Sequence, residues 1–100
     1  MEFIRKRLDL GRSKYGHGVR TRDNPQTWGT DKDSWYEMAE EEFADGVVYI
    51  CADYIRKFET PNEEGDDNQR ILQLLESPSL MVKSDEHRRK VETLMNLISV

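Results

Sequence analysis

The stretch from residue 34 to residue 58 constrains the fold of this chain more than any other. It contains no proline, and Pro61 lies just beyond its end. Ser34 and, three residues later, Glu37 match a capping box, in which a hydroxyl and a carboxylate satisfy the free amides of a helix start. Two basic residues at the other end suit the negative end of the helix dipole. We therefore expect one long helix over 34–58.

Apolar residues recur along this expected helix at intervals of three and four, in two neighbouring stripes. So broad an apolar face implies burial on two sides. A central helix of a bundle has this pattern, and so has a helix that packs both within its subunit and across a dimer interface. The stripes comprise Phe43, Val47, Ile50, Tyr54 and Phe58, and beside them Ala44, Val48, Cys51 and Ile55.

Three shorter segments show the same helical spacing of apolar residues. We expect a first helix over 1–15 and two C-terminal helices over 69–76 and 84–98. Turn-forming residues fill 16–33, which we interpret as a loop docked against the body of the protein. Four carboxylates within 60–68 indicate an acidic linker. No segment keeps the alternation of a strand.

The chain is expected to be an all-α single domain over residues 1–100, a small helical bundle with a long central helix that is both acidic and apolar. With 35% charged residues its core must be thin, so we expect oligomerisation to complete the bundle. Cys51 is alone, which excludes an intrachain disulfide and favours a reducing compartment. The absence of a signal core or a long apolar run predicts a cytoplasmic protein with no membrane partner.

Charge is unevenly distributed along the chain. Residues 1–23 carry a net charge of +4, residues 24–67 carry −10 and residues 68–100 carry +1. A basic strip beside an acidic one suits a phosphorylated small molecule, held by cations at one end and by carboxylate-bound metal at the other. Coverage of the surface by charged side chains explains the same pattern. The net charge of −5 disfavours nucleic acid as a partner.

Carboxylates are concentrated in the first turns of the expected long helix. Glu41 and Glu42 precede Asp45 by four and three residues, so each shares a side of the helix with Asp45, and carboxylate oxygens are ligands that magnesium prefers. The helix dipole offers another explanation for Glu37 and Glu40. It does not extend to Asp45, which lies past the second turn among apolar residues. We therefore predict that Glu41, Glu42 and Asp45 bind the metal.

Leu8 to Lys57 resemble the MazG-like all-α nucleoside triphosphate pyrophosphohydrolases, particularly the short versions of bacteriophages. The likeness lies in RLDLGRSKYGHG, a loop with Trp28, and EEEFADGVVYICADYIRK, where Glu42 and Asp45 look like the family's ExxD metal pair. The resemblance implies bound magnesium, attack of water on the α,β-phosphate bridge and release of pyrophosphate. Family members usually carry an ExxE pair on a preceding helix. Here the ExxE is on the same helix, which leaves two interpretations: a homodimer partner supplies the other ligands, or the chain is a remnant that binds without catalysis.

Substrate contacts are expected from the segment around two loop glycines, which let the backbone approach a ligand closely. Lys14, Tyr15, His17 and Arg20 are candidates for phosphate and base contacts, and Trp28 for base stacking. In the alternative interpretation Tyr15 and Trp28 cover the core and His17 is a solvated loop residue.

Two functions remain open at this level. The first is a magnesium-dependent nucleotide pyrophosphohydrolase-like protein, acting as a homodimer or higher oligomer in the cytoplasm, or in the host cytoplasm if viral. The second is a non-enzymatic phage-type interaction protein that binds a host protein or sequesters a nucleotide. Outside these candidate sites, His87 is expected to be a partly buried packing residue, and Asp53 either extends the acidic row or faces water.

Overall fold

The computed structural model describes residues 1–28, 34–60 and 64–98, and every regular element within them is a helix. The expectation of an all-α protein is confirmed. The chain divides into two compact units, Met1–Trp35 and Tyr36–Val100. Parts of the expected loop and of the acidic linker, residues 29–33 and 61–63, lie outside the described residues.

The first unit begins with α1 (Glu2–Tyr15), which reaches the end of its expected range. Gly16 terminates it in the left-handed conformation, with a φ of 79°, and its amide donates to the carbonyl of Arg12 at 2.9 Å. Glycine adopts this conformation without the steric penalty that a side chain imposes. None of the residues of α1 is buried. The apolar side chains of this helix are therefore exposed to solvent within the first unit.

The segment after α1 contains one short helical turn, η1 (Pro25–Trp28). Asn24 starts this turn, because its side-chain oxygen accepts from the amide of Gln26 at 2.7 Å. The indole nitrogen of Trp35 donates to the carbonyl of Thr21 at 3.0 Å. This hydrogen bond ties the loop to the residue at which the long helix starts.

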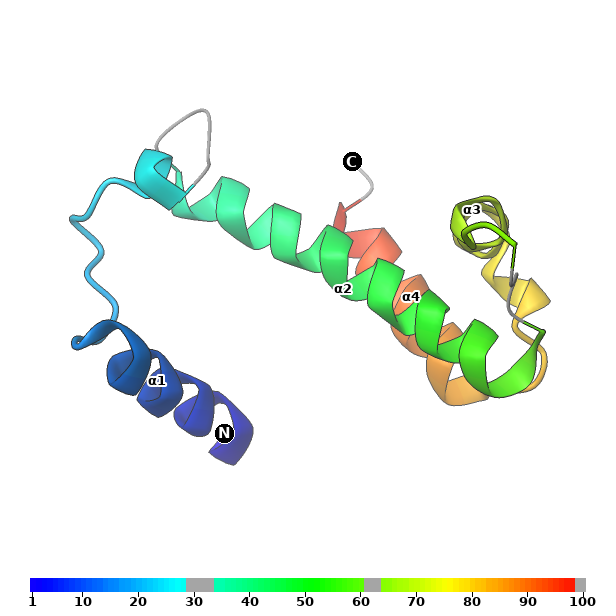
Figure 1. Ribbon diagram of the computed structural model, residues 1–100, viewed down its shortest axis with the longest axis horizontal. Helices are drawn as coiled ribbons and strands as arrows, with labels where there is room; N and C mark the ends of the chain where they lie inside the picture. Colours follow the sequence, from blue (N-terminus) through cyan, green and yellow to red (C-terminus); the bar gives the residue numbers. More distant parts are fainter. Residues whose placement is uncertain (29–33, 61–63, 99–100) are drawn as a thin grey trace. The chain divides into compact units, whose positions relative to one another are not determined.

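The second unit is organised around the long helix α2 (Trp35–Phe58), which packs against α4 (Asp85–Ile98) (Figure 1). Between them in the chain come α3 (Asn68–Glu76) and the short η2 (Pro78–Leu80). All four long helices lie within one residue of the ranges expected from the sequence.

α2 and α4 run in opposite directions. The carboxylate of Asp53 contacts His87. Gly46 lies about two turns closer to the start of α2, and a Cβ atom placed on it would lie 3.9 Å from a methyl group of Leu94. The C-terminal half of α2 is thus the half that α4 covers. Ile98 marks the end of the described part of α4 and is half-buried against the core.

The core of the second unit is small, as the high charge content predicts. Its centre is formed by apolar residues from α2 together with one residue each from α3, α4 and the segment after η2. Both apolar stripes of α2 contribute to this core, with Val47 and Tyr54 from the first and Cys51 and Ile55 from the second, whereas Val48 remains 38% exposed. The buried residues are Val47, Cys51, Tyr54, Ile55, Leu74, Met81 and Val91.

Polar contacts fix the segments that connect the helices of the second unit. Arg70 on α3 donates two hydrogen bonds to the carboxylate of Glu59, at 2.8 and 2.6 Å. Lys83 donates its backbone amide to the hydroxyl of Tyr54 at 3.2 Å and its ammonium group to the carbonyl of Phe58 at 3.1 Å. The end of α2 is therefore joined to both α3 and the start of α4.

The part of the chain that the structure describes contains no helix long and apolar enough to cross a membrane.

Candidate functional site

The predicted metal ligands lie on α2, on the side turned away from the core. Glu41, Glu42 and Asp45 are all exposed, because the helical period of 100° per residue places them roughly opposite Val47 and Cys51. Exposed carboxylates of one helix face are able to share a hydrated magnesium ion, which keeps several water ligands. Within residues 1–28, 34–60 and 64–98, no three His, Cys, Asp or Glu side chains come together as a metal-binding group.

The predicted substrate contacts lie in the first unit. The ammonium group of Lys14 is 5.4 Å from the centre of the Tyr15 ring, which is the geometry of a cation–π contact. Nδ1 of His17 lies 2.6 Å from the carbonyl oxygen of Gly18, so this nitrogen carries the proton and donates it. Arg20 is exposed. The side chain of Trp28 lies outside the described residues.

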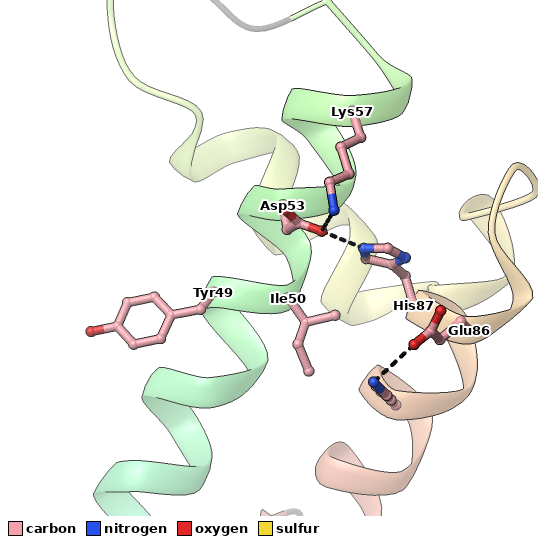
Figure 2. Close-up of a pocket in the computed structure, with 7 residues that line it drawn as sticks. Tyr49, Ile50, Asp53, Lys57, Glu86 and His87 are labelled. Atoms are coloured by element: carbon pink, nitrogen blue, oxygen red, sulfur yellow. Dashed lines mark hydrogen bonds and ion pairs between the residues drawn. The ribbon is translucent and has the colours of Figure 1, made fainter. Parts of the chain in front are cut away.

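A pocket that the sequence did not indicate opens between α2 and α4 (Figure 2). Its volume is about 320 Å³, at the lower end of the range of small-molecule sites. Both helices contribute charged side chains to it. The lining consists of Tyr49, Ile50, Asp53 and Lys57 from α2 and Glu86, His87 and Lys90 from α4.

His87 is the residue that organises this pocket. Its Nε2 lies 2.7 Å from Oδ2 of Asp53, and because a carboxylate only accepts, Nε2 donates. Nδ1 lies 2.6 Å from the hydroxyl of Ser84, and the backbone amide of His87 donates to the same hydroxyl oxygen at 3.2 Å. Ser84 is therefore the N-cap of α4, as the sequence predicted, and it also orients the imidazole.

The imidazole is also packed between aromatic rings. It meets the rings of Tyr54 and Phe58 edge-on, with centroid distances of 5.9 and 5.7 Å. The side chain of His87 is only 14% exposed. The expectation that His87 is a partly buried packing residue is confirmed, and the structure adds its two hydrogen-bond partners.

Asp53 contacts two cation-forming groups, His87 and Lys57, a position that neither of the two interpretations left open by the sequence included. The hydrogen bond from His87 holds the pKa of Asp53 below its ordinary value, and Lys57, at 3.1 Å, lowers it further. Asp53 thus belongs to the joint between α2 and α4 rather than to the acidic row. On the other side of the pocket, the ion pair with Lys90 lowers the pKa of Glu86.

Ser84, His87 and Asp53 form a Ser–His–Asp arrangement, which the sequence analysis did not identify. In a hydrolase of that type, the serine must present its oxygen to a substrate. Here the Ser84 oxygen caps α4 and is absent from the pocket lining. The three residues are therefore best described as a structural joint. The spacing of a helix-capping serine three residues before a histidine was the one signal in the sequence.

A second pocket lies next to the first and shares Ile50 and Lys90 with it. It has a volume of about 340 Å³ and is lined by Ile50, Arg89, Lys90, Thr93 and Leu94. Its lining is mainly apolar. The two pockets together follow the line along which α2 meets α4.

Comparison with models of known protein families, with curated proteins and with solved structures finds no match to this chain.

Proposed function

We propose that the chain is a magnesium-dependent nucleotide pyrophosphohydrolase-like protein that acts as a homodimer or higher oligomer. The observation that supports this proposal most is the exposure of Glu41, Glu42 and Asp45 on one side of α2. Carboxylates on an open helix face are accessible to a hydrated ion, to a phosphorylated ligand and to a second copy of the chain. The reaction in this proposal is the one that the resemblance to MazG-like enzymes implies.

In this proposal Glu41, Glu42 and Asp45 would hold the magnesium ion, which neutralises phosphate charge and activates water when it is bound. Lys14 and Arg20 pair with the phosphate oxygens. Both are exposed cations of the first unit, and charge-assisted hydrogen bonds to phosphate are stronger than neutral ones.

The base would be held by the aromatic ring of Tyr15, which is 51% exposed and also contacts the ammonium group of Lys14. His17 already donates from Nδ1 to Gly18, so its Nε2 is left as an acceptor for an amino or hydroxyl group of the nucleoside. These roles require the basic segment and the acidic row to bind one ligand.

The first experiment is calorimetric titration of magnesium together with a non-hydrolysable nucleoside triphosphate. Asp45→Asn should abolish the magnesium-dependent part of the heat, because it removes one ligand charge without changing the size of the side chain. Glu76→Gln, an exposed carboxylate at the end of α3, is the control and should bind like the wild type. Equal binding by all three proteins, or binding by none, would contradict the proposal.

Turnover is measured separately, as release of pyrophosphate from nucleoside triphosphates. The wild type should release it in magnesium and stop when the metal is chelated. A protein that binds nucleotide without releasing pyrophosphate would be a nucleotide-sequestering protein, as in our alternative hypothesis.

One observation favours the alternative of a protein that binds another protein. α1 exposes large apolar side chains, including Phe3 at 76%, and buries none. Contiguous exposed apolar surface is typical of protein-interaction sites. An interaction protein would keep its partner after Asp45→Asn, whereas the hydrolase proposal requires Asp45.

A further inference from the structure

One side of α1 combines apolar residues with most of the cations of the helix. The helical period places Ile4, Leu8 and Tyr15 on this side, while Glu2, Lys6 and Asp9 lie on the opposite side. Four cations border the apolar residues, two on each edge. We call the surface formed by the apolar residues and these four cations the basic face of α1, comprising Ile4, Leu8 and Tyr15 with Arg5 and Arg12 on one edge and Arg7 and Lys14 on the other.

The apolar residues of the basic face of α1 are about half exposed within the first unit. Ile4 and Leu8 are each 54% exposed and Tyr15 is 51% exposed. Arginine and lysine beside apolar residues extend the contact surface with their aliphatic stems and place their charge at its rim. Such a face fits a partner whose own apolar strip is flanked by carboxylates.

α2 carries a surface on which exposed carboxylates lie within about two turns of exposed apolar residues. Apolar Val48, at 38% exposure, and Tyr49, at 69%, lie on the same outer side of the helix as the exposed carboxylates. We call this surface the acidic face of α2, comprising Glu41, Glu42, Asp45, Val48 and Tyr49. In charge and in apolar content it is complementary to the basic face of α1.

We propose that the basic face of α1 packs on the acidic face of α2 of a second copy of this chain. Apolar contacts supply the affinity and the flanking charges set the register, because opposite charges across an interface select the partner and like charges exclude alternatives. Two acidic faces would repel each other, and so would two basic faces. The pairing is therefore heterologous in its surfaces, and two reciprocal contacts close a dimer.

This inference rests on the proposed function and completes its site. Lys14 and Tyr15 lie at the end of the basic face, so the contact brings the phosphate and base contacts of one copy to the metal ligands of the other. Each site then contains residues of both copies.

The test is a charge-swap experiment read by analytical ultracentrifugation, in chelator and without nucleotide. Arg7→Glu with Arg12→Glu cancels the net positive charge of the basic face, and Glu41→Lys with Asp45→Lys gives the acidic face a net positive charge. We expect each double variant to associate at least about tenfold more weakly than the wild type. An equimolar mixture of the two variants should regain dimers, since one contact of the mixed dimer is then wild-type on both sides and the other pairs the introduced glutamates with the introduced lysines.

Two control variants reverse charges at exposed positions elsewhere, Arg89→Glu on α4 and Glu76→Lys on α3, and should associate like the wild type. Leu8→Ser tests the apolar contribution against Leu72→Ser, since the two leucines are similarly exposed at 54% and 52%. Circular dichroism of each variant verifies that helix content is kept, and these side chains lie at the surface.

A wild type that stays monomeric at all concentrations would overturn the inference, as would equal weakening by the control variants or a mixture that does not regain dimers. The outcome is separable from that of the proposed function. Dimers in chelator, together with no magnesium binding, would support the proposed interface and contradict the proposed hydrolase function. Magnesium and nucleotide binding by a monomer would contradict the interface and the oligomeric state in the proposed function, but would support the nucleotide site.

Discussion

The imidazole of His87 lies 2.7 Å from the carboxylate of Asp53, although 34 positions of the sequence separate the two residues. This contact joins α2 to α4 at the edge of the core, beside the rings of Tyr54 and Phe58. The pocket around this contact therefore lies between two helices that the contact holds together.

Replacing His87 should weaken the packing of α4 on α2. We expect His87→Ala to lower the free energy of unfolding by about 1–2 kcal/mol, because it removes a hydrogen-bonded side chain and its ring contacts. Asp53→Asn should also destabilise the protein. The double variant should lose less than the sum of the two single losses, since both remove the same contact. Urea unfolding measures all three, and strict additivity would contradict the coupling.

The contribution of Asp53 should depend on pH in a defined direction. His87 and Lys57 lower the pKa of Asp53 below its ordinary value of 3.8, so the folded state holds the carboxylate in its charged form more strongly than the unfolded state does. The resulting stability is complete above pH 3.8 and is lost as the pH falls through the lowered pKa of the folded protein.

Urea unfolding of the wild type and Asp53→Asn checks this dependence. The difference in unfolding free energy should be largest near about pH 6 and should shrink below about pH 4. Glu76→Gln, compared with the wild type in the same way, should show no such change. A difference in unfolding free energy between the wild type and Asp53→Asn that stays constant as the pH falls would contradict the lowered pKa of Asp53.

Two leucines of α3 give a matched test of the core. Leu74 is fully buried, whereas Leu72 on the same helix is 52% exposed. Leu74→Ala should cost about 2–5 kcal/mol, because it removes buried methyl groups and leaves a cavity. Leu72→Ala should change stability by about 0.5 kcal/mol or less. Thermal or urea unfolding distinguishes them, and equal effects would show that α3 does not pack as described.

Cys51 should be unreactive in the folded protein. Its side chain is fully buried, and burial raises the pKa of the thiol to about 11. At about pH 8 only about one thiol in a thousand would be the reactive thiolate, even before access is considered. Alkylation by iodoacetamide should therefore be slow in buffer and fast in denaturant. Rapid alkylation of the native protein would mean that the core opens at α2.

Local signals were sufficient to predict the helices. The capping residue Ser84, the turn former Gly16 and the spacing of Val91 with its apolar neighbours each act over a few residues, and the structure follows all three. The length of α2 followed from the absence of proline. Elements set by short-range geometry are those that a single sequence reveals best.

The packing of side chains was harder to predict. Both apolar stripes of α2 contribute to its buried side, Val47 and Tyr54 from one and Cys51 and Ile55 from the other, while Val48 is partly exposed. Which residues of the stripes are covered depends on where α4 lies, and no local pattern encodes that. Met81 in the core follows a proline turn and has no helical period to mark it.

The candidate sites show the same division. The sequence placed Glu41, Glu42 and Asp45 on one helix face, and they do share the outer side of α2. The pocket at Asp53 and His87 was not foreseen, because it depends on two helices meeting. Whether the acidic row binds metal is a question for titration, since carboxylates on a helix surface have the same spacing with or without an ion.

The hydroxyl of Ser84 caps α4 and at the same time contacts the imidazole that joins this helix to α2. Most helix starts fray independently of the rest of the protein, so their amide hydrogens exchange quickly with solvent. Here, unwinding the first turn of α4 would also release His87 from Asp53 and from the rings of Tyr54 and Phe58. The beginning of α4 therefore unfolds together with the middle of α2. We expect the backbone amide hydrogen of His87 to exchange with solvent as slowly as the amide hydrogens of core residues.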